Sequence, residues 1–238
     1  MTKKTSLAKS LGFFFLSVLV VLALRWIGFE PYVIPSGSMI PTLLIHDHIV
    51  VSKFSYGLRL PFSRKWIWGP SLPSRGDIVV FRSVEKDDLF MIKRVVGLPG
   101  DKVKFTEAGD LYVNGEKIVS EPINDFGKLT NDDLMDSPNR FLLFQEKGLS
   151  PESHYVMLEK NAFRYTEQET TVGDGMLYLM GDNRDRSRDS RFWGELPIAN
   201  LLGRAQYVWL SCTAMLSENG RICNPNKIRW QRIFHKIQ

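Results

Sequence analysis

An uncharged, strongly apolar segment near the start of the chain constrains the fold more than any other feature. The fifteen residues from Ser10 to Leu24 carry no charge and are rich in Leu, Val and Phe. This run alone is short for a bilayer span, but apolar residues continue it to Phe29, and Arg25 can extend its long side chain to the interface. A helix over residues 11–29 would be roughly 28 Å long, close to the thickness of the hydrocarbon core. We therefore predict one N-terminal transmembrane helix over residues 11–29.

The flanks of this segment also fit a cleaved secretory signal, since a basic start precedes the apolar core. No small-x-small cleavage site follows, however, and Arg25-Trp26-Ile27 is a poor cleavage neighbourhood. We favour a retained anchor. The basic residues Lys3, Lys4 and Lys9 predict a cytoplasmic tail over residues 1–10, with the rest of the chain on the other side of the membrane.

Composition bounds the class of protein. The chain has 238 residues, of which 44% are hydrophobic and 24% charged, as in ordinary globular proteins. This length holds one sizeable domain, or one domain with a large insertion. The net charge is only +5 and the basic residues are dispersed. This pattern argues against a nucleic-acid partner and favours an anionic membrane surface.

The soluble part has the pattern of a mainly β protein. Short β-branched or apolar runs are bounded by Gly, Pro and Asp, and few long helical periods occur. An Asn-Gly pair within 111–118 predicts a β-hairpin. Residues 120–152 are polar and predict a loop-rich region. The predicted strands lie in residues 32–34, 49–51, 78–81, 89–96, 155–158 and 176–180.

Two further segments leave alternatives open. Residues 54–73 interleave aromatic and basic side chains, which is typical both of an interfacial membrane loop and of a hairpin packed on the core. In the tail, Trp230, Ile233, Phe234 and Ile237 follow a helical spacing. This spacing fits a basic amphipathic helix that touches lipid, but we favour a short terminal element that covers the β core.

Cysteines and histidines give little functional signal. Cys212 and Cys223 can form a disulfide outside the cytoplasm or remain free thiols, and the sequence leaves both possibilities open. His46 and His48 could share one strand face, but no further ligand cluster is visible. We therefore predict no metal site.

Serine and lysine residues carry the strongest chemical signal. Ser36-Gly37-Ser38 follows the apolar segment closely, and Lys93 lies within an apolar strand-like run. A serine hydroxyl is a poor nucleophile until a base removes its proton. Lysine can be that base only when apolar neighbours lower its pKa. These residues therefore raise the hypothesis of a Ser-Lys hydrolase at a membrane.

Four separate motifs, in the same order, resemble those of bacterial type I signal peptidases. They run from the anchor to about Ala205, apart from residues 105–173. The motifs are Ser36–Leu43, Arg75–Phe81, Ile92–Asp101, and Gly181–Asp185 followed by Ser187 and Asp189–Gly194.

The resemblance implies a role for each matching residue. Ser38 would be the nucleophile and neutral Lys93 the general base. The Ser38 N–H and the Ser36 hydroxyl would form the oxyanion hole, and Ser187 would orient Lys93. Asp182, Asp189 and Arg191 would form a structural ion network. The substrate pockets would be lined by Ile34, Pro35, Met39, Leu43, Met91 and Ile92.

The resemblance also implies a fold, a substrate and a location. The fold would be a coiled β-sheet core like that of signal peptidases and repressors, formed by residues 30–104 and 174–238, with a β-rich cap inserted at 105–173. The substrates would be secreted preproteins, cleaved after Ala-x-Ala-like sites. The protein would be a monomer that crosses the bacterial inner (cytoplasmic) membrane once, with the catalytic domain on the periplasmic or extracytoplasmic side. No cofactor is implied.

Two rival hypotheses remain. Self-cleaving Ser-Lys repressors share the catalytic pair, but they carry DNA-binding helices in place of an anchor. A membrane-anchored β module that only binds partners would not need Ser36, Ser38, Lys93 and Ser187 together.

Overall fold

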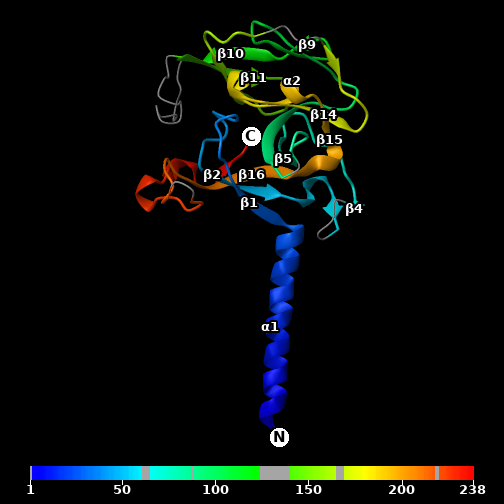
Figure 1. Ribbon diagram of the computed structural model, residues 1–238, viewed down its shortest axis with the longest axis vertical. Coiled ribbons are helices and arrows are strands. Elements are labelled where there is room, and N and C mark those ends of the chain that lie inside the picture. Colours follow the sequence, from blue (N-terminus) through cyan, green and yellow to red (C-terminus); the bar gives the residue numbers. More distant parts are fainter. Residues whose placement is uncertain (1, 61–64, 87, 124–139, 165–168, 218–219) are drawn as a thin grey trace.

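The N-terminal helix projects from a β-rich body. The computed structural model describes residues 2–60, 65–86, 88–123, 140–164, 169–217 and 220–238. Helix α1 (Thr2–Ile27) leaves the body as a single rod, and its described apolar side chains, such as those of Phe13 and Leu19, are exposed (Figure 1). Among the described residues, none of the helices is both long enough and apolar enough to cross a membrane.

One antiparallel sheet of eight strands forms the centre of the body (Figure 1). Its strands are rich in β-branched residues that pack on both faces, as expected for strands buried in a core. In order across the sheet they are β1 (Phe29–Val33), β2 (Asp47–Ser52), β16 (Leu201–Ser211), β5 (Ile78–Arg82), β6 (Phe90–Gly97), β14 (Met176–Met180) and β15 (Leu196–Pro197), and β17 (His235–Lys236) pairs with β16.

Smaller sheets cover one end of the body. The first consists of β13 (Thr170–Thr171), β7 (Lys102–Phe105), β8 (Leu111–Val113) and β9 (Glu116–Lys117). The second consists of β10 (Val119–Ile123), β11 (Phe141–Lys147) and β12 (His154–Glu159). A two-stranded ribbon, β3 (Leu58–Arg59) with β4 (Trp66–Trp68), lies on the side from which α1 leaves (Figure 1). The only other α-helix among the described residues is α2 (Ser190–Trp193).

The prediction of a mainly β protein is confirmed, and each of the six predicted strand segments overlaps a strand. The predicted hairpin is also present, because Asn114 and Gly115 both have the positive φ angles, 55° and 81°, that its two-residue turn requires. The loop-rich prediction for 120–152 is wrong in part, since β10 and β11 lie there; residues 124–139 are outside the described residues.

The helix suggested by the spacing of the tail does not form, but the favoured alternative, a short terminal element that covers the β core, is present. Only the single 3-10 turn Trp230–Arg232 forms, and β17 then pairs with β16. The chain cannot stay helical because Phe234 has a φ of 56°. Ile237 is buried in the core cluster of β1 and β2, whereas Trp230 and Phe234 are exposed. The tail therefore covers the sheet as an extended strap.

The aromatic segment 54–73 behaves in two ways. Tyr56 is buried and its hydroxyl donates to Asp77, as a core hairpin residue would. Phe54, Ile67 and Trp68 are exposed, as an interfacial loop would require. Residues 61–64 are outside the described residues. Tyr56 therefore fits a hairpin whose aromatic side chains pack on the core, and the interfacial membrane loop stays a prediction.

Candidate active site

Ser38 and Lys93 meet although 55 residues separate them. Ser38 lies in the loop between β1 and β2, and Lys93 lies in the middle of β6. Lys93 Nζ donates a hydrogen bond of 2.6 Å to Ser38 Oγ and a second, of 3.0 Å, to the carbonyl oxygen of Ile92. The lysine is only 3% exposed and the serine 9% exposed. An amine at this distance can take the hydroxyl proton directly.

The surroundings of Lys93 favour its neutral form. Burial lowers the pKa of its ammonium group from 10.5 to about 8, because the charged form loses its hydration. The carboxylates of Asp189 and Asp182 oppose this change, and the guanidinium of Arg191 adds to it. A substantial fraction of the lysine is therefore neutral near physiological pH.

The loop after β14 holds the backbone around the serine. The Asn183 N–H donates to the carbonyl oxygen of Ser38 at 3.1 Å, and its side-chain amide donates to the carbonyl oxygen of Gly37 at 2.9 Å. The Gly181 N–H donates to the Asp189 carboxylate at 2.9 Å, and this bond also fixes the loop. Two consecutive carbonyl groups beside the nucleophile are thereby held in place.

Ser187 and Ser36 occupy different environments. Ser187 is 4% exposed, and Gly181 packs against its side chain. Its hydroxyl has no hydrogen-bond partner among the described residues, so the predicted bond to Lys93 is not formed in this structure. Ser36 lies on the exposed side of the same loop as Ser38.

The three residues expected to form one ion network belong to two separate pairs. Asp189 accepts two hydrogen bonds of 2.8 Å from the Arg191 guanidinium. Asp182 instead accepts from Arg94, through Nε at 2.8 Å and Nη2 at 2.7 Å. Both pairs are almost fully buried, and the carboxylates of both act on Lys93.

The expected pocket residues divide into groups. Ile34, Met39, Leu43 and Ile92 pack together in one buried cluster beside the serine loop. Pro35 is exposed. Met91 packs against a different cluster, with Val79 and Leu177 among its members. The structure therefore brings four of the six together.

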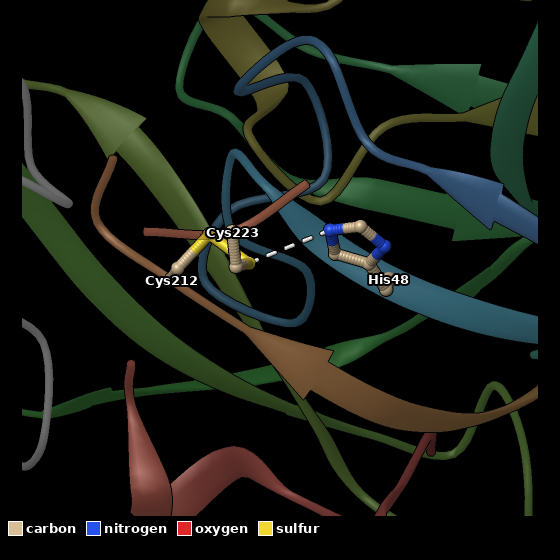
Figure 2. A group of neighbouring side chains, drawn as sticks. All are labelled: His48, Cys212 and Cys223. Carbon is tan, nitrogen blue, oxygen red and sulfur yellow. Dashed lines mark hydrogen bonds between the residues drawn. A yellow bond between two sulfur atoms is a disulfide. The ribbon is translucent and has the colours of Figure 1, made fainter. Parts of the chain in front are cut away.

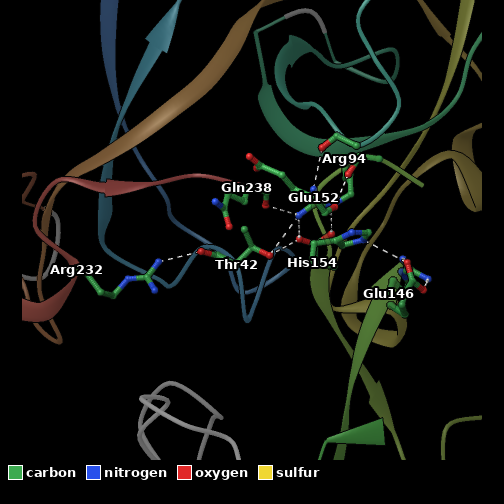
Figure 3. Close-up of polar contacts among 11 residues, drawn as sticks. Thr42, Arg94, Glu146, Glu152, His154, Arg232 and Gln238 are labelled. Atoms are coloured by element: carbon green, nitrogen blue, oxygen red, sulfur yellow. Dashed lines mark hydrogen bonds and ion pairs between the residues drawn. The ribbon is translucent and has the colours of Figure 1, made fainter. Parts of the chain in front are cut away.

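Several polar residues of the site were not predicted from the sequence. Arg94 also binds the carbonyl oxygens of Gly76 at 2.8 Å and Gln238 at 3.0 Å, and Thr42 donates to Asp182 (Figure 3). The motif Ile92–Asp101 contains Arg94, but nothing local indicates which carboxylate it meets. Arg94 and Asp182 are 88 residues apart in the chain, so their pairing cannot be predicted from either segment alone.

A second buried network joins the inserted sheets to the loop that carries Asn183. Arg184 donates to both carboxylate oxygens of Glu146, at 2.7 and 2.6 Å, and His154 Nε2 lies 3.2 Å from the same carboxylate (Figure 3). The Met157 N–H donates to the carbonyl oxygen of Asp182 at 2.8 Å. Strands β11 and β12 thus support the loop that positions the serine.

The sequence is similar to known proteins over most of its length. The model of the family described as "Signal peptidase, peptidase S26" matches residues 7–210. A signal peptidase I of Pseudomonas aeruginosa is 40% identical over 213 residues, which cover 83% of this chain and 70% of that protein. A signal peptidase I of Buchnera aphidicola subsp. Baizongia pistaciae is 32% identical and covers 97% of this chain and 84% of its own.

A solved structure of a signal peptidase I from Enterococcus faecalis covers 56% of this chain and 97% of its own, at 25% identity and a TM-score of 0.35. This overall similarity is too low to compare the architectures. The family match and the curated relatives both extend over most of the sequence. The chain belongs to the signal peptidase family, peptidase S26, and is a serine endopeptidase of the signal peptidase I type.

Proposed function

We propose that this chain cleaves signal peptides from secreted preproteins with Ser38 as nucleophile and Lys93 as general base. The hydrogen bond of 2.6 Å between Lys93 Nζ and Ser38 Oγ carries the proposal. The burial that lowers the pKa of Lys93 to about 8 supports it, because only a neutral amine accepts a proton. The other titratable groups of the site are carboxylates held in ion pairs with arginines.

The reaction has two stages. Ser38 Oγ attacks the scissile carbonyl carbon while Lys93 takes its proton, and the lysine then gives this proton to the leaving amine. Water next attacks the acyl-enzyme, with Lys93 again as base, and releases the signal peptide. The Ser38 N–H and the Ser36 hydroxyl would stabilise the oxyanion.

Ser187 would orient Lys93 once a substrate closes the site. Its hydroxyl is buried beside Gly181 and has no other partner among the described residues, so it is available to accept a hydrogen bond from the lysine. The two ion pairs Arg94–Asp182 and Arg191–Asp189 would keep this loop in place.

The substrate would be recognised by small side chains. The buried cluster of Ile34, Met39, Leu43 and Ile92 would give the substrate pockets an apolar lining. Cleavage would follow Ala-x-Ala-like sites, as the resemblance to the family implies. Pro35 and Met91 would complete the pockets only if the substrate reaches beyond this cluster.

Membrane attachment through α1 is also part of the proposal. The helix ends at Ile27, and β1 begins at Phe29, so the serine loop lies close to the helix end in the chain. Apolar side chains such as Phe13 and Leu19 are exposed along it, which supports burial in lipid. The catalytic body would lie on the extracytoplasmic side of the bacterial inner membrane, as a monomer without a cofactor.

The test is cleavage of a preprotein by the purified full chain in detergent. Wild type should cut once after a small-x-small site, and Lys93→Ala should not cut. Lys102→Ala is the matched control, because this lysine is exposed and forms only a loose ion pair of 3.9 Å with Glu169. Cleavage by Lys93→Ala at the wild-type rate would refute the Ser-Lys mechanism.

A further inference from the structure

The inserted sheets reach the support of the active site through the side chain of Phe105. This residue ends β7, at the start of the insertion, and is 2% exposed. The guanidinium of Arg191 lies over its ring, with Cζ 4.9 Å from the ring centroid, and Cζ of Arg184 lies 6.0 Å from the same centroid. A cation over an aromatic face is attracted by the ring, most strongly where water is excluded. Both arginine side chains are buried, so this attraction is effective at Phe105.

The guanidinium of Arg191 serves the ring and two hydrogen-bond acceptors at once. It donates two bonds of 2.8 Å to the Asp189 carboxylate, and its Nη2 also donates to the carbonyl oxygen of Arg184. The same carboxylate accepts from the Gly181 N–H at 2.9 Å. Because the guanidinium is planar, one orientation must satisfy the carboxylate, the carbonyl group and the ring together.

The amine of Lys93 lies in the field of these charges. The carboxylates of Asp189 and Asp182 favour its charged form, and the guanidinium of Arg191 disfavours it. Arg94, the next residue of β6, is paired with Asp182. If the Arg191 guanidinium moved away, Asp189 would be less neutralised and the repulsion on Lys93 would weaken. Both changes would favour the ammonium form, which cannot accept a proton.

We propose that Phe105 is a positioning residue for the Ser-Lys reaction: its ring holds the Arg191 guanidinium on the Asp189 carboxylate and so sets the balance of charge around Lys93. This inference rests on the proposed function, because it concerns the amine that acts as base. Phe105 would act through Arg191 rather than by touching the substrate. The insertion would thereby help to set the pH range in which the enzyme is active.

Two buried histidines must be distinguished from Lys93 in a pH profile. His48 lies against the disulfide that Cys212 and Cys223 form, with its Nε2 3.5 Å from Cys223 Sγ (Figure 2). His154 belongs to the second buried network. Burial lowers the pKa of both imidazoles below the ordinary value of 6.5. Both therefore titrate at lower pH than Lys93, whose pKa is about 8.

The test is the pH profile of kcat/KM for Phe105→Leu, with a peptide that has an Ala-x-Ala site and no titratable side chain. The midpoint of the acid limb should rise by about half a pH unit relative to wild type, which lowers kcat/KM about threefold at pH 7 and leaves it nearly unchanged at pH 9.5. Phe105→Tyr keeps the ring and should keep the wild-type midpoint. A wild-type midpoint in Phe105→Leu would overturn the proposal. A wild-type enzyme without a midpoint near 8 would instead contradict the role of Lys93 as base, so the two failures are distinguishable.

Phe141→Leu is the matched control. Phe141 is also 2% exposed, and Cζ of Arg186 lies 4.8 Å from its ring centroid, but Arg186 pairs with Glu159 and not with a carboxylate that acts on Lys93. This variant also removes a buried ring from beneath an arginine, yet its midpoint should not move. Equal shifts in the two leucine variants would overturn the proposal.

Circular dichroism checks that each variant folds. If Phe105→Leu does not fold, Phe105→Met takes its place, because methionine fills more of the volume of the ring. If neither ring-free variant folds, the role of the ring is structural and the positioning role is overturned.

Discussion

Gly181 lies directly against the main-chain oxygen of Ser38. A β-carbon at this position would stand closer to that oxygen, and to the Ser187 side chain, than van der Waals contact allows. The neighbouring Asn183 N–H donates to the same Ser38 oxygen at 3.1 Å. The loop after β14 can therefore support the nucleophile only because residue 181 has no side chain.

We expect Gly181→Ala to lower kcat strongly, by 100-fold or more, because the added methyl group must displace the backbone that carries Ser38. Steady-state cleavage of a short peptide with an Ala-x-Ala site measures this loss. Gly173→Ala is the control, since its new methyl group would meet only flexible side-chain atoms of Glu195 and Met176 and no backbone. Equal activity of the two variants would show that the close packing at Gly181 does not matter.

The pH profile should identify the base. The pKa of Lys93 is lowered to about 8, and the neutral form is the active one, so activity should rise with pH and level off above 8. Between pH 6 and pH 7, kcat/KM should increase about tenfold, as expected for a single group that titrates near 8. The measurement is kcat/KM for a peptide without titratable side chains, from pH 5.5 to 9.5. A midpoint near 6.5 would indicate a histidine instead.

Much of the sheet follows from local sequence. Runs such as Ile78–Phe81 contain β-branched residues bounded by Gly and Asp, and the turn at Asn114-Gly115 needs positive φ angles that these residues allow. β16 was not predicted, because Arg204 and Gln206 interrupt its apolar pattern and its long pairings with β2 and β5 are not encoded locally.

The site could be predicted only in part. The serine motif near the apolar segment and Lys93 in its apolar run raise the Ser-Lys hypothesis, but only the resemblance in four motifs pairs Ser38 with Lys93, because 55 residues separate them. The pairing of Arg94 with Asp182, and the support from Glu146, depend on contacts between distant segments. The helical spacing of the tail is misleading, because pairing with β16 determines its conformation.

The Arg94–Asp182 pair should be important for stability. Both side chains are 1% exposed, so Arg94→Leu leaves a buried charge on Asp182, and we expect a loss of about 3–5 kcal/mol in the free energy of unfolding. Urea unfolding of the two single variants and of Arg94→Leu/Asp182→Asn gives the coupling energy, and the double variant should recover part of the loss.

Arg204→Leu is the control for the Arg94–Asp182 pair. Its ion pair with Asp77 at 3.0 Å is exposed on the arginine side, so it should cost less than about 1 kcal/mol. Additive losses in the Arg94–Asp182 cycle would contradict the expected coupling.

Glu146 should make the protein sensitive to acid. Burial alone would raise the pKa of its carboxyl group, but Arg184 and His154 outweigh this effect and lower it from 4.5 to about 2. Because the pKa is lower in the folded state, the carboxylate stabilises the protein above pH 4.5, and this contribution is lost as the pH falls from 4.5 towards 2.

Glu146→Gln tests this directly. At pH 7 the variant should be less stable than wild type, because the buried Arg184 guanidinium loses the carboxylate to which it donates at 2.7 and 2.6 Å. The difference in the free energy of unfolding between the two proteins, measured with urea at pH 7, 4 and 3, should shrink as the pH falls. Glu116→Gln, at an exposed position of β9, should show no such trend. A difference that is the same at all three pH values would mean that Glu146 does not titrate in this range.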